Sequence, residues 1–130
     1  EKEANYSLLS HIPPSMPALL RAYVITKRAA KVGFDWPKIE DVYEKMEEET
    51  VELRNAQATG DQERMREEVG DLLFTVVNIA RFLSVDPEDA LRATSDKFIR
   101  RFTYIEENTD TRSATLETMD RLWNEAKNKK

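Results

Sequence analysis

The feature that most constrains this chain is a helix-forming stretch, residues 66–83, that is too apolar to lie on a surface. From Leu72 onwards apolar residues occupy nearly every side of the expected helix, a pattern typical of a helix buried all round. One face carries four polar residues spaced three, four and three positions apart: Glu68, Asp71, Thr75 and Asn78. Burying charged groups costs free energy unless they are paired or bind a metal ion. The stretch therefore predicts a cation or another charged partner for its carboxylates.

A second helix-forming stretch lies upstream and carries more acidic residues. Apolar residues recur at helical spacing over residues 39–53, and we expect Asp35 or Trp36 to precede this helix. Beside that stripe, one side of the helix carries Lys45, Glu48, Glu49 and Glu52. Gly60 and Asp61 then form a short loop. Two helices joined by so short a loop form an antiparallel hairpin, so we expect the carboxylates of both helices to face each other.

Three further helices are expected, and no strand. Residues 17–31 form an amphipathic helix that stops at Gly33, since glycine commonly ends a helix. Asp86 and Pro87 are a strong start signal for a helix that runs to about residue 108, and residues 116–127 carry a last apolar stripe. Gly and Pro are scarce, at 3 and 5 residues, and no segment alternates as a strand does. The predicted fold class is all-α.

Composition narrows the range of functions. At 130 residues the chain is predicted to be one domain with a real core. Its net charge of -5 argues against a broad surface for polymeric nucleic acid. Without cysteine there is no disulfide or thiolate nucleophile, and no apolar run approaches the ~20 residues of a membrane span. These features fit a cytoplasmic protein. The first residue, Glu1, is not methionine, so the sequence is also compatible with a piece of a longer protein.

The expected meeting of carboxylates from two helices predicts a metal site. Without cations such groups repel each other, and an oxygen-rich pocket suits Mg²⁺ or Mn²⁺, which link carboxylates to substrate phosphates. Iron is disfavoured because di-iron bundles use Glu-x-x-His pairs, whereas His11, the only histidine, lies in the N-terminal lead-in. The alternative is a solvated acidic helix face. We accept that alternative for Glu47 and Glu67, and it is weaker for Glu68 and Asp71, whose helix has almost no polar face to spare.

Residues nearer the C-terminus are candidate nucleotide contacts. Lys97 and Arg101 share one helix face, where they either form surface ion pairs or, beside an acidic metal site, bind phosphate. Trp123 either packs in the core or stacks on a base. Gly70, within the buried helix, either allows a close approach or is simply tolerated. Because four modest helices cannot cover a helix buried all round, we expect a partner subunit.

The acidic residues, taken in order, resemble those of the MazG-type nucleoside triphosphate pyrophosphohydrolases. Residues 45–53, KMEEETVEL, match the E-E-x-x-E element of that family, and residues 68–71, EVGD, match its E-x-x-D element. The similarity covers nearly the whole chain from about residue 9 to residue 127. An E-E-x-x-E element alone would be weak, but both elements in this order are specific. The resemblance implies one MazG-like domain over residues 1–130, with an irregular lead-in over residues 1–14.

The resemblance also implies an architecture and an activity. The all-α protomer would contain a central helical hairpin, and two protomers would form a homodimer with a four-helix bundle around each site. The activity would be Mg²⁺-dependent hydrolysis of nucleoside or deoxynucleoside triphosphates to monophosphate and pyrophosphate, with Mn²⁺ able to substitute. One alternative is a narrower pyrophosphatase for a deoxynucleotide or a modified base. The other is a non-catalytic helical dimer that binds a nucleotide or a protein and regulates.

The site residues follow from the same resemblance. The acids that would hold the metal and act in catalysis are Glu48, Glu49, Glu52, Glu68 and Asp71. The residues that would contact the substrate are Lys45, Asn78, Lys97, Arg101 and Trp123. Ser95 departs from the family pattern, which has Asn at that place, so a secondary contact is in doubt while the metal site is not. Retention of all five acids argues against the non-catalytic alternative, because binding alone needs fewer.

Overall fold

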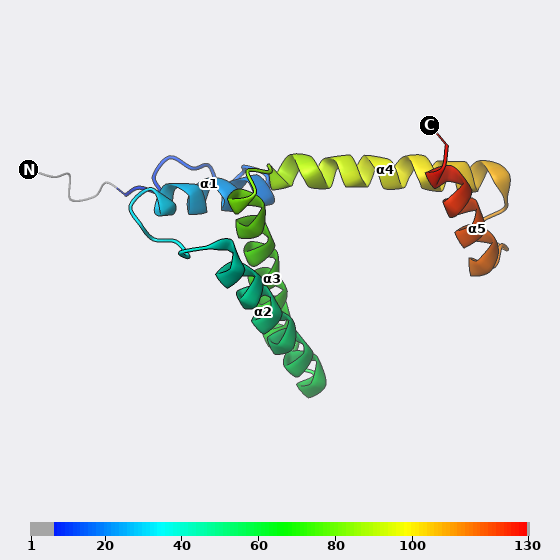
Figure 1. Ribbon diagram of the computed structural model, residues 1–130. Coiled ribbons are helices and arrows are strands. Elements are labelled where there is room, and N and C mark those ends of the chain that lie inside the picture. The colour runs from blue at the N-terminus through cyan, green and yellow to red at the C-terminus, as the bar shows by residue number, and fades with distance from the viewer. Residues whose placement is uncertain (1–6, 130) are drawn as a thin grey trace, which may run out of the picture. The chain divides into compact units, whose positions relative to one another are not determined.

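The computed structural model describes residues 7–129, and this part of the chain is helical without a strand (Figure 1). Its helices are α1 (Ala18–Ala30), α2 (Ile39–Thr59), α3 (Gln62–Phe82), α4 (Pro87–Asn108) and α5 (Leu116–Lys127). The all-α prediction is confirmed. The chain divides into two compact units, Glu1–Glu88 and Asp89–Lys130. Residues 1–6 of the expected lead-in lie outside the described residues.

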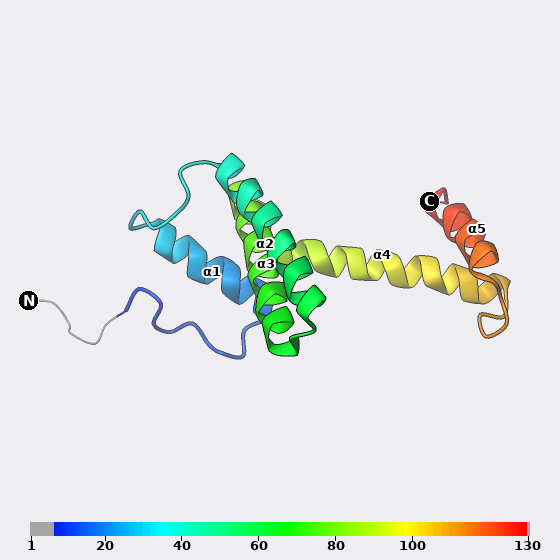
Figure 2. The same cartoon turned by 90° about the horizontal axis from the view of Figure 1, so that it is seen from below.

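Helices α2 and α3 form the predicted antiparallel hairpin, and the two views of Figures 1 and 2 show them side by side. Gly60 ends α2 in the left-handed region at φ 73°, where a residue without Cβ is favoured. The Asp61 side chain caps α3 by accepting hydrogen bonds from the backbone N–H groups of Glu63 and Arg64 at 3.1 and 3.2 Å. Glycine and aspartate together turn the chain within two residues. The hairpin is therefore a local consequence of the sequence.

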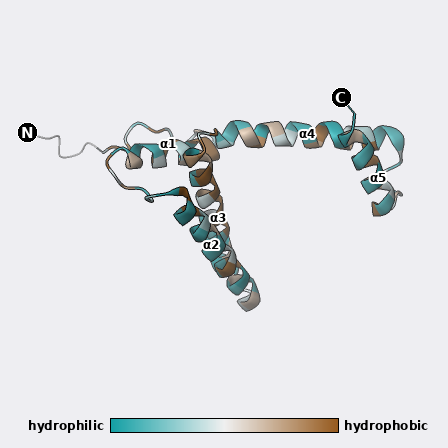
Figure 3. Cartoon of the chain, in the orientation of Figure 1, coloured by the Kyte–Doolittle hydropathy of each residue, from teal (hydrophilic) through white to brown (hydrophobic). Residues whose placement is uncertain are grey.

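Within the described chain α3 is buried on only part of its circumference, and the partner subunit expected to cover the rest stays a prediction. Val77, Asn78 and Ile79 are buried, and α3 packs against both α1 and α2. The opposite side remains exposed, with Leu73 at 53% of its full accessible surface. Val69 and Val76 lie on the same side as Leu73, and Phe74 is exposed on another side of the helix. Figure 3 shows hydrophobic residues mainly in the C-terminal part of α3. Two neighbouring helices can cover only part of the circumference of such a helix.

The loop before α2 is attached to the end of α3 by an ion pair. Arg81 donates hydrogen bonds from Nη1 and Nη2 to the two carboxylate oxygens of Asp35 at 2.9 and 2.7 Å. Asp35 also accepts a hydrogen bond from the backbone N–H of Trp36. α2 begins at Ile39 with Lys38 as its N-cap residue, so Asp35 and Trp36 precede the helix within the loop and do not cap it. The bidentate pair fixes where α2 enters the hairpin.

Asp35→Asn should destabilise the protein at neutral pH and lose this effect in acid. Hydrogen bonds from Arg81 lower the pKa of Asp35, partial burial opposes that shift, and the charge of Arg81 and the Trp36 N–H add to it. A lowered pKa means stability that is present above the unfolded-state pKa of about 3.9 and is lost as pH falls through the folded-state pKa. We expect the variant to lose about 1–2 kcal/mol of unfolding free energy at pH 7 and less below pH ~4.

Urea unfolding between pH 7 and pH 3 measures this difference. Glu63→Gln is the control, because Glu63 forms an exposed pair with Arg66 at 3.2 Å, and exposed pairs contribute about 0–1 kcal/mol. A deficit of Asp35→Asn that stays constant down to pH 3 would contradict the assignment of the ion pair.

The second unit contains most of α4 together with α5. Both helices have the predicted bounds, and Asp86 acts as the expected start signal by accepting the N–H of Glu88 at 2.9 Å. Thr115, which was not predicted as a cap, caps α5 by accepting a hydrogen bond from the N–H of Thr118. The ring centroids of Phe98 in α4 and Trp123 in α5 lie 5.3 Å apart. Among the described residues, no helix has the length and apolar character needed to cross a membrane.

Candidate functional site

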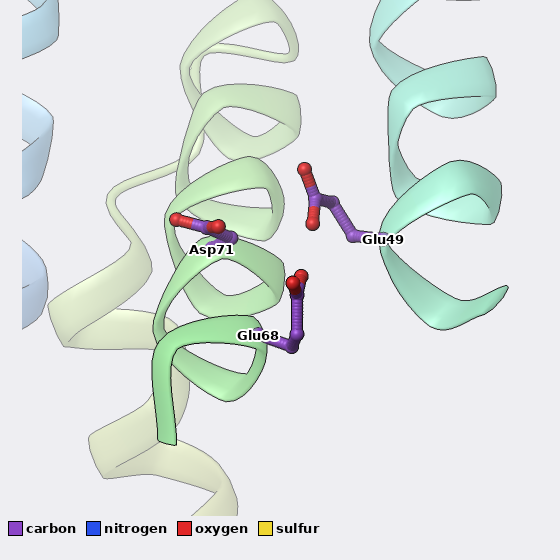
Figure 4. A group of neighbouring side chains, drawn as sticks. All are labelled: Glu49, Glu68 and Asp71. Carbon is purple, nitrogen blue, oxygen red and sulfur yellow. The ribbon is translucent and has the colours of Figure 1, made fainter. Parts of the chain in front are cut away.

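Three carboxylates from the two arms of the hairpin come together, and we call them the carboxylate cluster: Glu49, Glu68 and Asp71. Each offers one oxygen that lies within 4.8 Å of the oxygens offered by the other two. Figure 4 shows Glu49 reaching from α2 towards the two acids of α3. The predicted meeting of acidic groups across the hairpin is therefore present in the structure.

Helical spacing and hairpin packing explain why these side chains meet. Glu68 and Asp71 are three residues apart, so they lie on one face of α3. Glu49 is the member of the acidic run in α2 that faces the hairpin interior, and only 6% of its surface is exposed. Glu68 is partly buried and Asp71 is exposed. The cluster is thus closed at Glu49 and open to solvent at Asp71.

The charge of the cluster is poorly balanced within the chain. Burial raises the pKa of Glu68, as do a hydrogen bond with Glu49 and repulsion from Glu49, Glu52 and Asp71. The closest cation is Lys45, whose Nζ lies 3.1 Å from Glu49 and 3.3 Å from Glu48. Hydrogen bonds with Glu49 and Glu48 raise the pKa of Lys45. One ammonium group cannot neutralise three neighbouring carboxylates.

The remaining two predicted acids flank the cluster on α2. Glu48 is exposed and pairs with Lys45, whereas Glu52 is partly buried and lies 3.7 Å from Arg64. Within the described residues they are not part of the cluster. Arg64 itself was missed in the sequence analysis, although its position four residues before Glu68 puts it on the acidic face of α3.

Asn78 occupies a different setting from the other predicted substrate contacts. It has no exposed surface, and its Nδ2 donates to the carbonyl of Phe74 at 2.9 Å. Its Oδ1 accepts a hydrogen bond from Nη2 of Arg81 at 2.7 Å. Arg81, which also holds Asp35, was missed, yet it continues the polar line three residues after Asn78. Asn78, at the C-terminal end of the polar line on α3, therefore belongs to a buried hydrogen-bond network.

Lys97, Arg101 and Trp123 belong to the second unit. Lys97 is exposed, and the guanidinium of Arg101 lies 5.4 Å from the ring of Trp123 in a cation–π contact. Trp123 is partly buried and also lines an apolar hollow of about 350 Å³ with Phe98 and Phe102. Trp123 therefore has packing partners inside this unit.

His11 and Gly70 have few neighbours in the structure. His11 is exposed, in keeping with the absence of a role for it in the expected site. A Cβ built on Gly70 would meet nothing within 4 Å, so no described part of the chain makes the close approach that one alternative required. A partner or ligand approaching Gly70 stays a prediction.

The donor set fits a hard divalent cation. Carboxylate oxygens are the ligands preferred by Mg²⁺ and Mn²⁺, and the cluster contains no nitrogen or sulfur donor. Glu49, Glu68 and Asp71 could bind one ion directly, and Glu48 or Glu52 could complete its shell by rotating their side chains. A divalent ion would also remove the repulsion that raises the pKa of Glu68.

Comparisons with known proteins find one family and several relatives with similar sequences. Residues 38–105 match the MazG nucleotide pyrophosphohydrolase domain family, a region that contains α2, α3 and most of α4. The chain is 44% identical over 135 residues to a nucleoside triphosphate pyrophosphohydrolase of Escherichia coli K12, covering 97% of this chain and 51% of that protein. It is 45% identical over 126 residues to the nucleoside triphosphate pyrophosphohydrolase/pyrophosphatase MazG of Thermotoga maritima, covering 93% and 48%. The chain spans about half the length of these relatives.

Proposed function

Because the chain belongs to the MazG nucleotide pyrophosphohydrolase domain family, we propose that it hydrolyses nucleoside or deoxynucleoside triphosphates to monophosphate and pyrophosphate. The observation that supports this most is the carboxylate cluster, which α2 and α3 build inside the region shared with the family. The expected cofactor is Mg²⁺, with Mn²⁺ able to replace it. A cytoplasmic location and the absence of a polymeric nucleic acid partner stay predictions.

The proposed metal ligands are the five acids Glu48, Glu49, Glu52, Glu68 and Asp71. Three of them are already close enough to share an ion. When bound, a divalent ion supplies charge neutralisation for the triphosphate and makes water a better nucleophile at neutral pH. One of the α2 acids would orient the attacking water or accept its proton, with attack in line near the α–β bridge. Catalysis then rests on positioning and electrostatics.

The proposed substrate contacts lie on both units of the chain. Lys45 would contact phosphates, Lys97 and Arg101 would stabilise negative charge on the departing pyrophosphate, and Trp123 would contact the nucleotide. Asn78 has a structural role in the proposed site, since its buried amide is hydrogen bonded to Phe74 and Arg81. Through that network it would hold the end of α3 in place.

A second copy of the chain is the proposed partner. The exposed apolar side of α3 needs cover, and a matching hairpin from another protomer would bury it in a four-helix bundle. Leu73→Glu should prevent this homodimer, because a carboxylate would replace an apolar side chain at the centre of the exposed side. Analytical ultracentrifugation would then show a dimer for wild type and a monomer for the variant. Val32→Glu, at an exposed loop residue, is the control, and a dimeric Leu73→Glu protein would place the interface elsewhere.

The reaction is tested by incubating a panel of NTPs and dNTPs with Mg²⁺ or with EDTA. We expect monophosphate and pyrophosphate in Mg²⁺ and no product in EDTA. Turnover of a single deoxynucleotide alone would favour the narrower pyrophosphatase. Orthophosphate as the first product would show that the bond cleaved is not the one between the α- and β-phosphates. Binding of nucleotide without turnover of any panel member would favour the regulatory dimer.

A further inference from the structure

We propose that Lys45 is the built-in counter-ion of the carboxylate cluster and that a divalent metal ion displaces it. This inference rests on the proposed function, because it concerns the order in which the same site takes up metal and substrate. Lys45 would neutralise Glu49 while the site holds no ion, and its ammonium group would become available to the triphosphate once metal has bound.

The contacts of Lys45 carry the proposal. Its Nζ lies 3.1 Å from Oε2 of Glu49 and 3.3 Å from Oε2 of Glu48. Within the described chain, no other lysine or arginine lies within ion-pair distance of the carboxylate cluster, since Arg64 reaches Glu52 instead. Lys45 is therefore the cation on which the cluster depends.

This pair differs from an ordinary surface pair. Surface pairs between lysine and glutamate contribute little because water screens both groups. The side chain of Glu49 is only 8% exposed, so its charge would be costly without a partner. In addition, Lys45 precedes its acidic partners along the helix, which is the weaker order for stabilising a helix by itself. The contact is better explained by the charge of the site than by the stability of α2.

A metal ion and Lys45 would compete for the same oxygen. An ion bound by the carboxylate cluster draws on Glu49, whose Oε2 accepts the hydrogen bond from Lys45. Two cations on one carboxylate repel each other strongly in a partly buried site. The side chain of Lys45 is 37% exposed and flexible, so its ammonium group can move outward. The displaced ammonium group is then available to the phosphates of the substrate.

Mg²⁺ binding measured by calorimetry without nucleotide tests the proposal. Lys45→Gln removes the competing ammonium, so we expect the affinity for Mg²⁺ to rise about three- to tenfold. Arg66→Gln is the matched control: it also removes one positive charge, and Arg66 pairs with Glu63 outside the cluster. The control should bind Mg²⁺ within about twofold of wild type. Unchanged or weaker binding by Lys45→Gln would overturn the proposal.

A measurement on wild type keeps the test valid if Lys45→Gln folds poorly. The side-chain NMR signals of Lys45, assigned with Lys45→Arg, should move towards those of the exposed Lys38 when Mg²⁺ is added at constant pH. Signals that do not move while Mg²⁺ binds would show that the ion pair persists, and would overturn this inference alone. If wild type binds no Mg²⁺, the metal site of the proposed function fails as well.

Discussion

Glu49→Gln is expected to lower kcat/KM for triphosphate hydrolysis by about 10³-fold or more, because it removes a charged ligand where phosphate charge must be neutralised. Glu49 is the one acid of α2 that meets both Glu68 and Asp71, and it is the most deeply buried of the three. Glutamine keeps its size, so the hairpin should retain its packing. Pyrophosphate release at saturating Mg²⁺ measures the loss.

Glu47→Gln is the control for this prediction. Glu47 precedes the acidic pair on α2, is exposed, and was interpreted from the sequence as part of a solvated face. Its replacement should leave the rate within about twofold of wild type, as expected for surface substitutions. Far-UV circular dichroism should show equal helix content in both variants. Near-normal turnover of Glu49→Gln would move the metal site away from the hairpin.

Asp71→Asn should abolish the stabilisation of the folded protein by Mg²⁺. A ligand that binds only the folded state at 100 times its Kd raises the unfolding free energy by about 2.7 kcal/mol. Asp71 is exposed, so the variant should unfold like wild type in EDTA. Once Mg²⁺ is added, wild type should gain this stability and the variant should gain little. Urea unfolding of wild type and of Asp71→Asn, each with EDTA and with Mg²⁺, gives the four unfolding free energies to compare.

Glu67→Gln is the matched control on α3. Glu67 is an exposed neighbour of Glu68 outside the carboxylate cluster, so its variant should gain as much stability from Mg²⁺ as wild type. An Asp71→Asn protein that is still stabilised fully by Mg²⁺ would remove Asp71 from the ligand set. Loss of stabilisation in both variants would point to the general negative charge of α3 rather than to a defined site.

Much of the fold could be read from local chemistry. The bounds of α4 and α5 agree with the prediction because Asp86 caps the start of α4 and an apolar stripe marks α5. The hairpin was predictable because Gly60 and Asp61 end one helix and start the next within two residues. These are interactions between residues close in sequence, which need no knowledge of the tertiary structure.

Long-range contacts were not predictable in this way. The ion pair between Asp35 and Arg81 joins residues 46 positions apart, and it attaches the loop before α2 to the end of α3. A partner subunit was expected to cover the exposed side of α3, but hydropathy alone does not identify the chain that provides this cover. By contrast, the contact between Asn78 and Arg81 is local, because Arg81 lies three residues later on the same polar line of α3.

By itself the sequence determined that Glu68 and Asp71 share one face and that an acidic run in α2 would lie opposite them. The period of the helix is responsible, since it sets the direction of every side chain around its own axis. Only the tertiary structure decided that Glu49, rather than Glu48 or Glu52, completes the cluster. That choice depends on the rotation of α2 against α3, which is set by side chains packing between the helices, including buried Val42 and Ala56.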